Sequence, residues 1–289
     1  MNTLDLSNNV NLSTLECSST GLLNLDLASN TSLTYLQCGN NSLTELDLTN
    51  NQSLDYLQCN HNALSSLDLT SNTSLTYLNC RSNQINTFDL SNNAALSYFD
   101  CHGNIHTDLD LSQNNELTFL SAGSTNMSQI DVSNLINLKT LIVFWLDDLD
   151  VSNNIFLEVL NVNSCNFATI DISANLFLTG LGFPYSQLTS IDISNNTMLE
   201  EIYGNQSQLE SLDISNNILL RTLECKECQL TELISGNNDS LLAVACCNNQ
   251  LTSLDFSDNN ALYSLCAHDN QLTCLDIHNG VDFLWLSIF

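Results

Sequence analysis

The sequence predicts a repeat solenoid of 21-residue coils, with short parallel β-strands on both faces and little or no α-helix. Three observations support this fold class. One column recurs at a constant spacing, and its first members are Cys17, Cys38, Cys59, Cys80 and Cys101. An aspartate column with the same period runs from Asp5 to Asp276, interrupted by Ile234 and by one unit that is two residues short. Between these columns the apolar residues alternate with period 2, as in strands, which leaves no room for helical periodicity.

Each repeat consists of two half-repeats, and each half predicts one strand. The unit LTYLQCGNNSLTELDLTNNQS spans Leu33–Ser53. Alternate residues of a strand face opposite sides, so Leu36 and Cys38 in the first half, and Leu46 and Leu48 in the second, are expected to point inward. Like strands of successive coils then lie side by side, and each coil is stabilised mainly by its neighbours.

Each half-repeat ends at an asparagine, Asn41 in the first half and Asn51 in the second. An inward amide can bond the backbone N–H and C=O groups that the turn leaves unpaired. The array is expected to form a single domain over 1–289, with about 13 coils and both ends uncapped. An irregular coil is expected near 138–157, where the unit LKTLIVFWLDDLDVSNNIF lacks two residues.

The composition excludes several classes of partner. Of the 289 residues, 43% are hydrophobic, which is enough to bury a core. The 32 acidic and 4 basic residues give a formal net charge of -28. Phosphate neutralisation needs Lys and Arg, so no nucleic acid and no anionic membrane surface is expected as a partner. Short apolar runs predict no membrane insertion, and the first thirty residues carry no signal-peptide pattern.

The pattern L-x-x-L-x-C-x-x-N-x-L-x-x-L-D-L/V-S-x-N resembles the 21-residue leucine-rich repeat of the internalin J type, in which cysteine replaces one core leucine. The resemblance covers essentially the whole chain. It implies a right-handed leucine-rich-repeat array in a protein that is secreted by a bacterium or displayed on its cell surface and serves adhesion or recognition. The usual flanking caps and anchors are not found, so we interpret the chain as the repeat region of a larger protein.

The cysteines are expected to be free thiols. Like side chains on adjacent strands are about 4.8 Å apart, whereas the Cβ atoms of a disulfide are about 3.8 Å apart. Cys225 and Cys228 have a metal-ligand spacing, but both occupy structural positions, so we predict no metal centre or cofactor apart from weak Ca²⁺ binding. Cys247 and Cys266 are expected to point outward.

One outward column is aromatic on five successive coils, and its members are Tyr35, Tyr56, Tyr77, Tyr98 and Phe119. Such a column can be cross-strand packing, or a flat surface that binds a protein or glycan ligand. In the shortened unit, Phe144 is the best candidate for an exposed anchor beside Trp145. The alternative for Trp145 is that it turns inward to fill the distorted turn.

The aspartate column has two interpretations. Carboxylates at strand spacing can bind Ca²⁺ weakly, and the candidates are Asp47, Asp68, Asp89 and Asp110. A solvated face that keeps the sheet soluble explains the same column, and we favour this interpretation because one flat column offers few oxygen ligands to each ion.

No catalytic motif is present, and the only local cluster is His106, Asp108 and Asp110. The leading hypothesis is a non-enzymatic recognition or adhesion module. The alternatives are a polysaccharide-active β-solenoid enzyme and a passive spacer stiffened by cations. The ends, Met1–Leu6 and Phe283–Phe289, each supply part of a coil, so end-to-end self-association promoted by salt is also expected.

Overall fold

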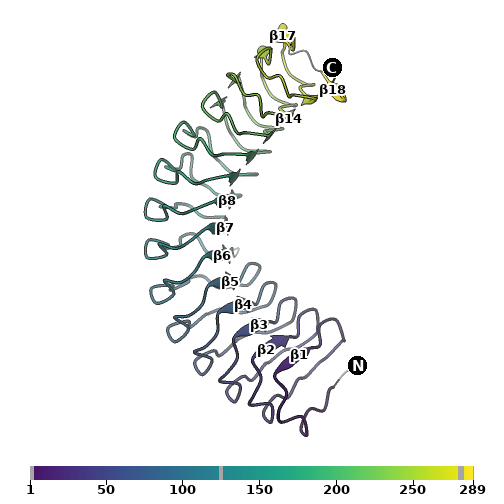
Figure 1. Cartoon of the computed structure of the whole chain (residues 1–289), viewed down its shortest axis with the longest axis vertical. Helices are drawn as coiled ribbons and strands as arrows, with labels where there is room; N and C mark the ends of the chain where they lie inside the picture. Colours follow the sequence, from purple (N-terminus) through teal and green to yellow (C-terminus); the bar gives the residue numbers. More distant parts are fainter. Residues whose placement is uncertain (1–2, 124–125, 279–282, 289) are drawn as a thin grey trace. The chain divides into compact units, whose positions relative to one another are not determined.

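The computed structural model describes residues 3–123, 126–278 and 283–288. The chain divides into two compact units, Met1–Ile142 and Val143–Phe289. Its described residues form about 13 turns of 21 residues whose regular elements are all short strands, which confirms the fold class (Figure 1). No helix among them could cross a membrane. The single domain expected over 1–289 stays a prediction.

In the first unit, each coil contributes one strand from its first half-repeat. Neighbouring strands pair in parallel with an offset of one repeat, so that Tyr35 lies opposite Tyr56 and Leu36 opposite Leu57. The strands are β1 (Thr14–Glu16), β2 (Tyr35–Gln37), β3 (Tyr56–Gln58), β4 (Tyr77–Asn79), β5 (Tyr98–Asp100) and β6 (Phe119–Ala122).

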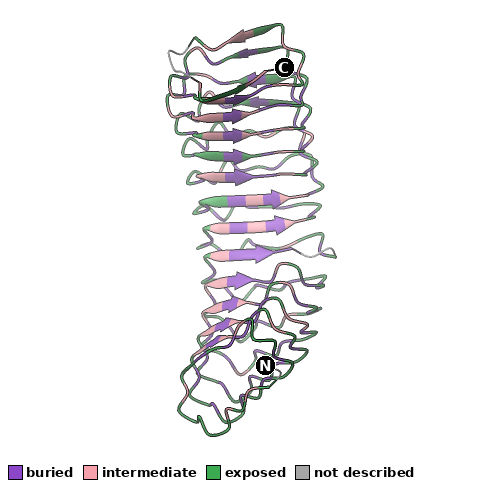
Figure 2. Cartoon of the chain, turned by 90° about the vertical axis from the view of Figure 1, so that its right-hand side faces the viewer, coloured by how far each residue is buried: buried purple, intermediate pink, exposed green. Residues whose placement is uncertain are grey.

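The second unit repeats this arrangement. Its first-half strands are β8 (Val159–Asn163), β9 (Gly180–Gly182), β10 (Glu201–Tyr203), β12 (Thr222–Glu224), β14 (Ala243–Ala245), β16 (Ser264–Cys266) and β18 (Trp285–Ser287). Strand β7 (Thr140–Phe144) contains the point at which the two units divide. In Figure 2, buried and exposed residues alternate along these coils.

The prediction of a strand in every second half-repeat is wrong. Second-half strands form only two pairs among the described residues, namely β11 (Ser211–Asp213) with β13 (Glu232–Ile234) and β15 (Ser253–Asp255) with β17 (Cys274–Asp276). A parallel ladder requires neighbouring segments to approach to about 4.8 Å. These coils meet that condition on their second side, where the Ile214 N–H donates to the Ile234 carbonyl at 2.9 Å.

Leucine and cysteine columns form the core. Cys38, Cys59, Cys80 and Cys101 are fully buried between leucines of the same coils. The structure holds all twelve cysteines as free thiols, and Cys274 is the exposed one. Burial raises the pKa of the Cys17 thiol to about 11, so this first member of the cysteine column is protonated at neutral pH.

The turn asparagines bond neighbouring coils, as the sequence predicts. The Asn41 Nδ2 donates to the carbonyls of Cys17 and Cys38 at 3.0 Å, and its Oδ1 accepts the Leu22 N–H at 3.0 Å. In the other turn, the Asn51 Nδ2 donates to the Asn30 carbonyl at 2.9 Å. These amides satisfy backbone groups that the strands leave unpaired.

The shortened unit keeps the register of its strand and loses residues from its turn. Trp145 occupies the left-handed backbone position that recurs in the coils, with φ of 59°. The Leu146 carbonyl accepts the Asn166 N–H at 2.7 Å, as the Leu43 carbonyl accepts the Ala63 N–H at 2.8 Å. Leu146 therefore takes the position of Leu43, and the two missing residues are the turn asparagine and the residue after it.

Candidate functional site

The aromatic column of the first unit forms one continuous stack, which we call the aromatic row. It consists of Tyr35, Tyr56, Tyr77, Tyr98 and Phe119. Successive ring centroids are 4.1 to 4.3 Å apart, and the ring planes differ by 7 to 14°. All five side chains are half-buried. The structure therefore brings together every member that the sequence predicted.

The parallel register produces this stack directly. In-register pairing with an offset of one repeat places identical side chains at the strand spacing, which is close enough for ring faces to contact. The neighbouring amides fix the ring edges, because the Gln37 Nε2 donates to the Tyr35 hydroxyl and the Tyr56 hydroxyl donates to Gln58 Oε1 at 3.1 Å. Desolvation, followed by the neighbouring Tyr56 hydroxyl, raises the pKa of Tyr35.

Charged groups lie beside the later rings of the row. Asp100 is buried, and this burial raises the pKa of its carboxyl group although the His102 N–H donates to its Oδ1 at 3.2 Å. Burial, followed by the charge of Arg81, lowers the pKa of His102. The arrangement offers flat aromatic edges next to amides and one ionisable cluster, a combination suited to binding and without a nucleophile–base pair.

The shortened unit adds two aromatic side chains to the surface of the second unit. Trp145 is 38% exposed, so the interpretation in which it turns inward is wrong. Phe144 is half-buried, and its ring centroid lies 5.4 Å from that of Trp145 at an angle of 39°. The more exposed residue is therefore Trp145, and Phe144 supports its ring.

The aspartate column is exposed, and each carboxylate already accepts local hydrogen bonds. Asp68 Oδ1 accepts the Thr70 N–H at 3.0 Å and its hydroxyl at 2.7 Å, while Asp47 and Asp89 accept the same pair of bonds from Thr49 and Ser91. These bonds, with the hydroxyl contributing most, lower the pKa of Asp47, Asp68 and Asp89. For Asp110 the backbone N–H of Ser112 is the largest cause of the lowered pKa. Calcium binding by the four stays a prediction.

The cluster proposed for the enzymatic alternative does not assemble. His106 is buried, and its ring meets that of Phe88 edge-on at 5.3 Å. Burial lowers the pKa of His106, so the ring is neutral. Asp108 and Asp110 are exposed, and the Asp108 carboxylate accepts the N–H of Leu109 at 2.8 Å. The histidine and the carboxylates thus lie in different environments.

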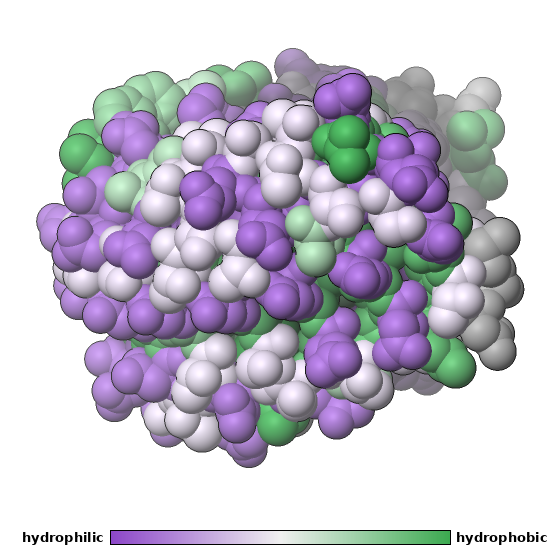
Figure 3. Space-filling model, turned by 90° about the horizontal axis from the view of Figure 1, so that it is seen from below, coloured by the Kyte–Doolittle hydropathy of each residue, from purple (hydrophilic) through white to green (hydrophobic). Residues whose placement is uncertain are grey.

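Sequence reasoning missed an apolar edge on the second unit, which we call the turn-edge strip. Its members follow the turn asparagines of consecutive coils and are 40 to 56% exposed, namely Ile155, Phe156, Leu176, Phe177, Met198, Ile218 and Leu219. The rings of Phe156 and Phe177 are 6.1 Å apart. The signal was present in the sequence, since the same positions carry Thr31, Ser32, Gln52 and Ser53 in the first unit. Figure 3 shows a contrasting face at the amino-terminal end, where hydrophilic side chains predominate.

Two cysteines lie differently from the prediction. Cys247 and Cys266 are only 3% and 4% exposed, so the expected outward, accessible thiols are not found. Together with His268 they form a compact group of potential ligands. By contrast, Cys228 behaves as the sequence predicts, because its thiol bonds the Gly204 carbonyl at 3.1 Å in the position of a turn asparagine.

No protein-family model and no curated protein matches the chain. Solved structures do match it, and together with the 21-residue coils they define a leucine-rich-repeat solenoid. The functional domain of InlJ from Listeria monocytogenes, which includes a cysteine ladder, is 32% identical, covers 93% of this chain and has a TM-score of 0.81. The chain spans 66% of the length of that structure. The chain belongs to the leucine-rich-repeat proteins, and its repeats are of the internalin J type.

Two further structures share the fold. A leucine-rich-repeat protein of Leptospira interrogans is 18% identical, with a TM-score of 0.84, and covers 98% of this chain and 86% of its own. The LRIM1/APL1C complex contains a chain that is 16% identical, with a TM-score of 0.69, and the match covers 94% of this chain and 54% of that one.

Proposed function

We propose that the array is a non-enzymatic recognition module that binds a protein ligand through the aromatic row. The observation that carries this proposal is the stack of five half-buried rings on consecutive strands, flanked by glutamine amides. Rigid rings bind with little loss of side-chain entropy, and amides beside them supply directional hydrogen bonds. A glycan is the alternative ligand, since sugar rings also bind to aromatic surfaces.

The charge of the chain restricts the partner. With 32 acidic and 4 basic residues, the array repels anionic surfaces and attracts cationic ones over long range. A ligand with a neutral or basic contact surface is therefore favoured, and its association is expected to slow as salt increases.

The matched structures support a binding role. The solved part of InlJ is a functional domain with a cysteine ladder, and LRIM1 and APL1C form a complex with each other. By analogy we place this chain in a protein secreted by a bacterium or displayed on its surface, where it serves adhesion. Its repeats would then present the aromatic row to a partner outside the cell.

Peptide display on the intact chain tests the proposal and requires no identified ligand. We expect peptides selected on the wild type to lose about 30-fold in affinity for a Tyr56→Ser, Tyr77→Ser variant, because removing two central rings costs about 2 kcal/mol. A Phe156→Ser, Phe177→Ser variant is the matched control, since it removes two exposed rings from the turn-edge strip.

The two variants separate the competing outcomes. Loss of binding in the tyrosine variant alone supports the aromatic row, provided that its circular dichroism is unchanged. Loss in the phenylalanine variant alone assigns recognition to the turn-edge strip and refutes the proposed surface. A parallel glycan array that shows tyrosine-dependent binding of sugars, with no selected peptides, would replace the protein ligand by a glycan.

A further inference from the structure

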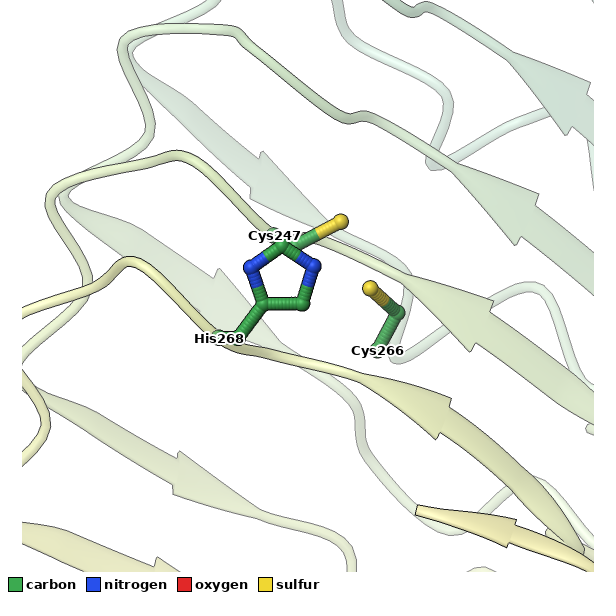
Figure 4. Close-up of side chains that lie close together, drawn as sticks. All are labelled: Cys247, Cys266 and His268. Carbon is green, nitrogen blue, oxygen red and sulfur yellow. The ribbon is translucent and has the colours of Figure 1, made fainter. Parts of the chain in front are cut away.

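We propose that Cys247, Cys266 and His268 form a binding site for one thiophilic divalent cation, with Zn²⁺ as the best match. One ligand atom from each side chain lies within 4.8 Å of the other two (Figure 4). Figure 4 shows the imidazole ring and both sulfur atoms converging on one side of the coils. This site is separate from the aromatic row and does not depend on the proposed function.

The repeat geometry explains why these three residues meet. Ala245 at the end of β14 pairs with Cys266 at the end of β16, so Cys247 lies opposite His268 two positions later. Positions two apart on an extended chain face the same side, which brings Cys266 and His268 together. His268 lies opposite Cys247, and Cys266 comes two positions before His268. Cys247 and Cys266 are therefore diagonal neighbours on adjacent strands.

The same three positions, two coils earlier, show that this diagonal is a true contact. There the residues are Asn205, Glu224 and Lys226. The Asn205 Nδ2 donates to Glu224 Oε2 at 2.9 Å, and the Lys226 Nζ lies 3.4 Å from the same carboxylate oxygen. The fold therefore brings polar atoms from these positions to bonding distance, and the last coils place two thiols and an imidazole there instead.

The chemistry of the donors fits Zn²⁺. Ligand atoms of a tetrahedral zinc site are about 3.3 to 3.8 Å apart, given Zn–S of about 2.3 Å and Zn–N of about 2.0 Å. The three ligand atoms, which lie within 4.8 Å of one another, would have to approach by about 1 Å to reach these distances. Binding replaces two thiol protons, which leave as two H⁺, by two Zn–S bonds. The two thiolates and a neutral imidazole then balance the charge of the ion.

A carboxylate already orients the histidine. His268 Nδ1 lies 2.6 Å from Asp269 Oδ2, and a carboxylate at this position accepts the Nδ1 proton. The lone pair is then on Nε2, which is left for the metal, as in carboxylate–histidine–zinc arrangements. The side chain of His268 is 28% exposed, so an ion can enter beside it while both sulfur atoms are shielded.

Cobalt titration of the intact, reduced 289-residue chain tests the site. We expect one Co²⁺ to bind with a thiolate-to-cobalt charge-transfer band and the visible bands of a tetrahedral site, and one equivalent of Zn²⁺ to abolish both. Cys247→Ser and His268→Gln should each weaken binding by about 100-fold or more, and Asp269→Asn by about 10-fold. Cys225→Ser is the matched control, because it removes another buried cysteine from a neighbouring coil.

Each result decides for or against the site. Retained binding in the Cys225→Ser variant, with loss of binding in Cys247→Ser and His268→Gln and unchanged circular dichroism in all three, supports the site. Absence of a charge-transfer band in the wild type refutes it, and so does equal loss of binding in the control. The site is also refuted if the protein, after treatment with a reductant, still has a mass two hydrogens lower than expected and binds no cobalt. Cys247 and Cys266 would then form a stable disulfide.

Discussion

The most specific packing prediction concerns Gly204, which lies against a large aromatic ring in the second unit. A Cβ atom at this position would be 2.2 Å from Phe183 Cε2 and 2.6 Å from its Cζ. Carbon atoms in contact are normally about 3.5 to 4.0 Å apart, so Gly204→Ala must displace the ring by more than about 1 Å. Phe183 is fully buried, and protein cores are close-packed, so a displaced ring must push against its neighbours.

The magnitude follows from two opposing effects. Overpacking of a closed core costs about 1 to 3 kcal/mol, and so short a contact belongs at the upper end. Replacing glycine by alanine also restricts the unfolded chain, which stabilises the protein by about 0.4 to 1 kcal/mol. We therefore expect Gly204→Ala to lower the free energy of unfolding by about 2 kcal/mol, measured by urea unfolding at constant m-value.

A double-mutant cycle tests the cause. Phe183→Val installs the residue found one coil earlier at Val162, and alone it should cost about 2 to 3 kcal/mol through the cavity it leaves. In the double variant the new methyl group fills part of that cavity. The double variant should therefore be destabilised by about 2 kcal/mol less than the sum of the two single variants. Additivity within about 0.5 kcal/mol would show that the ring does not limit this position.

Gly180→Ala is the matched control for the backbone effect. Its added Cβ would meet Val159 Cγ2 at 3.6 Å and Cγ1 at 3.8 Å, which are ordinary contacts. This variant should be neutral or up to about 1 kcal/mol more stable. If it is destabilised as much as Gly204→Ala, the steric argument fails.

Three further predictions address the thiols, the aspartate column and the carboxyl-terminal strand. Titration of the denatured, unreduced chain should return nearly all twelve cysteines as free thiols, and several native disulfides would contradict the column geometry. Because the Ser91 hydroxyl helps to lower the pKa of Asp89, its stabilising effect is present above the ordinary pKa of aspartate and is lost as pH falls through the folded-state value. Ser91→Ala should therefore lower the melting temperature at neutral pH and not at about pH 2, and an equal change at both would refute the carboxylate as its partner. Leu284 and Trp285 are 82% and 51% exposed, so added salt should promote self-association that Leu284→Ser with Trp285→Ser reduces in light scattering. The predictions that involve Met1 and Phe289 lie outside the described residues.

The core columns and the aromatic row could be predicted from the sequence, because a single strand register, with an offset of one repeat, accounts for both. The constant repeat length fixes which side chains are neighbours on adjacent coils, and period 2 fixes which face each occupies. Tyr35 and Tyr56 therefore stack as expected, and Asn41 bonds the coil before it. The large–small pair of Phe183 and Gly204 follows from the same column.

The second-half strands could not be predicted in this way. All second half-repeats share nearly the same pattern, yet Ser211–Asp213 and Glu232–Ile234 pair as strands, whereas most others within the described part of the chain do not. Pairing depends on the distance between coils on that side, which the whole stack sets. The burial of Cys247 was also not predicted, because period 2 assigns the residue to the outward face but does not give its exposure there.

The repeat columns of the sequence did not predict the group of Cys247, Cys266 and His268, because a column shows only one kind of neighbour. A column joins residues one full repeat apart, but a strand also contacts its neighbour diagonally, two positions short of a repeat. The Asn205 amide bonds Glu224, and the Asn166 Nδ2 donates to Asp147 Oδ1 at 2.8 Å, both across this diagonal. In an array whose columns encode the scaffold, a functional site is a local departure, and its ligands come from both kinds of neighbour. Cys247 with His268 uses the column, and Cys247 with Cys266 uses the diagonal, so the two together place three ligands around one point.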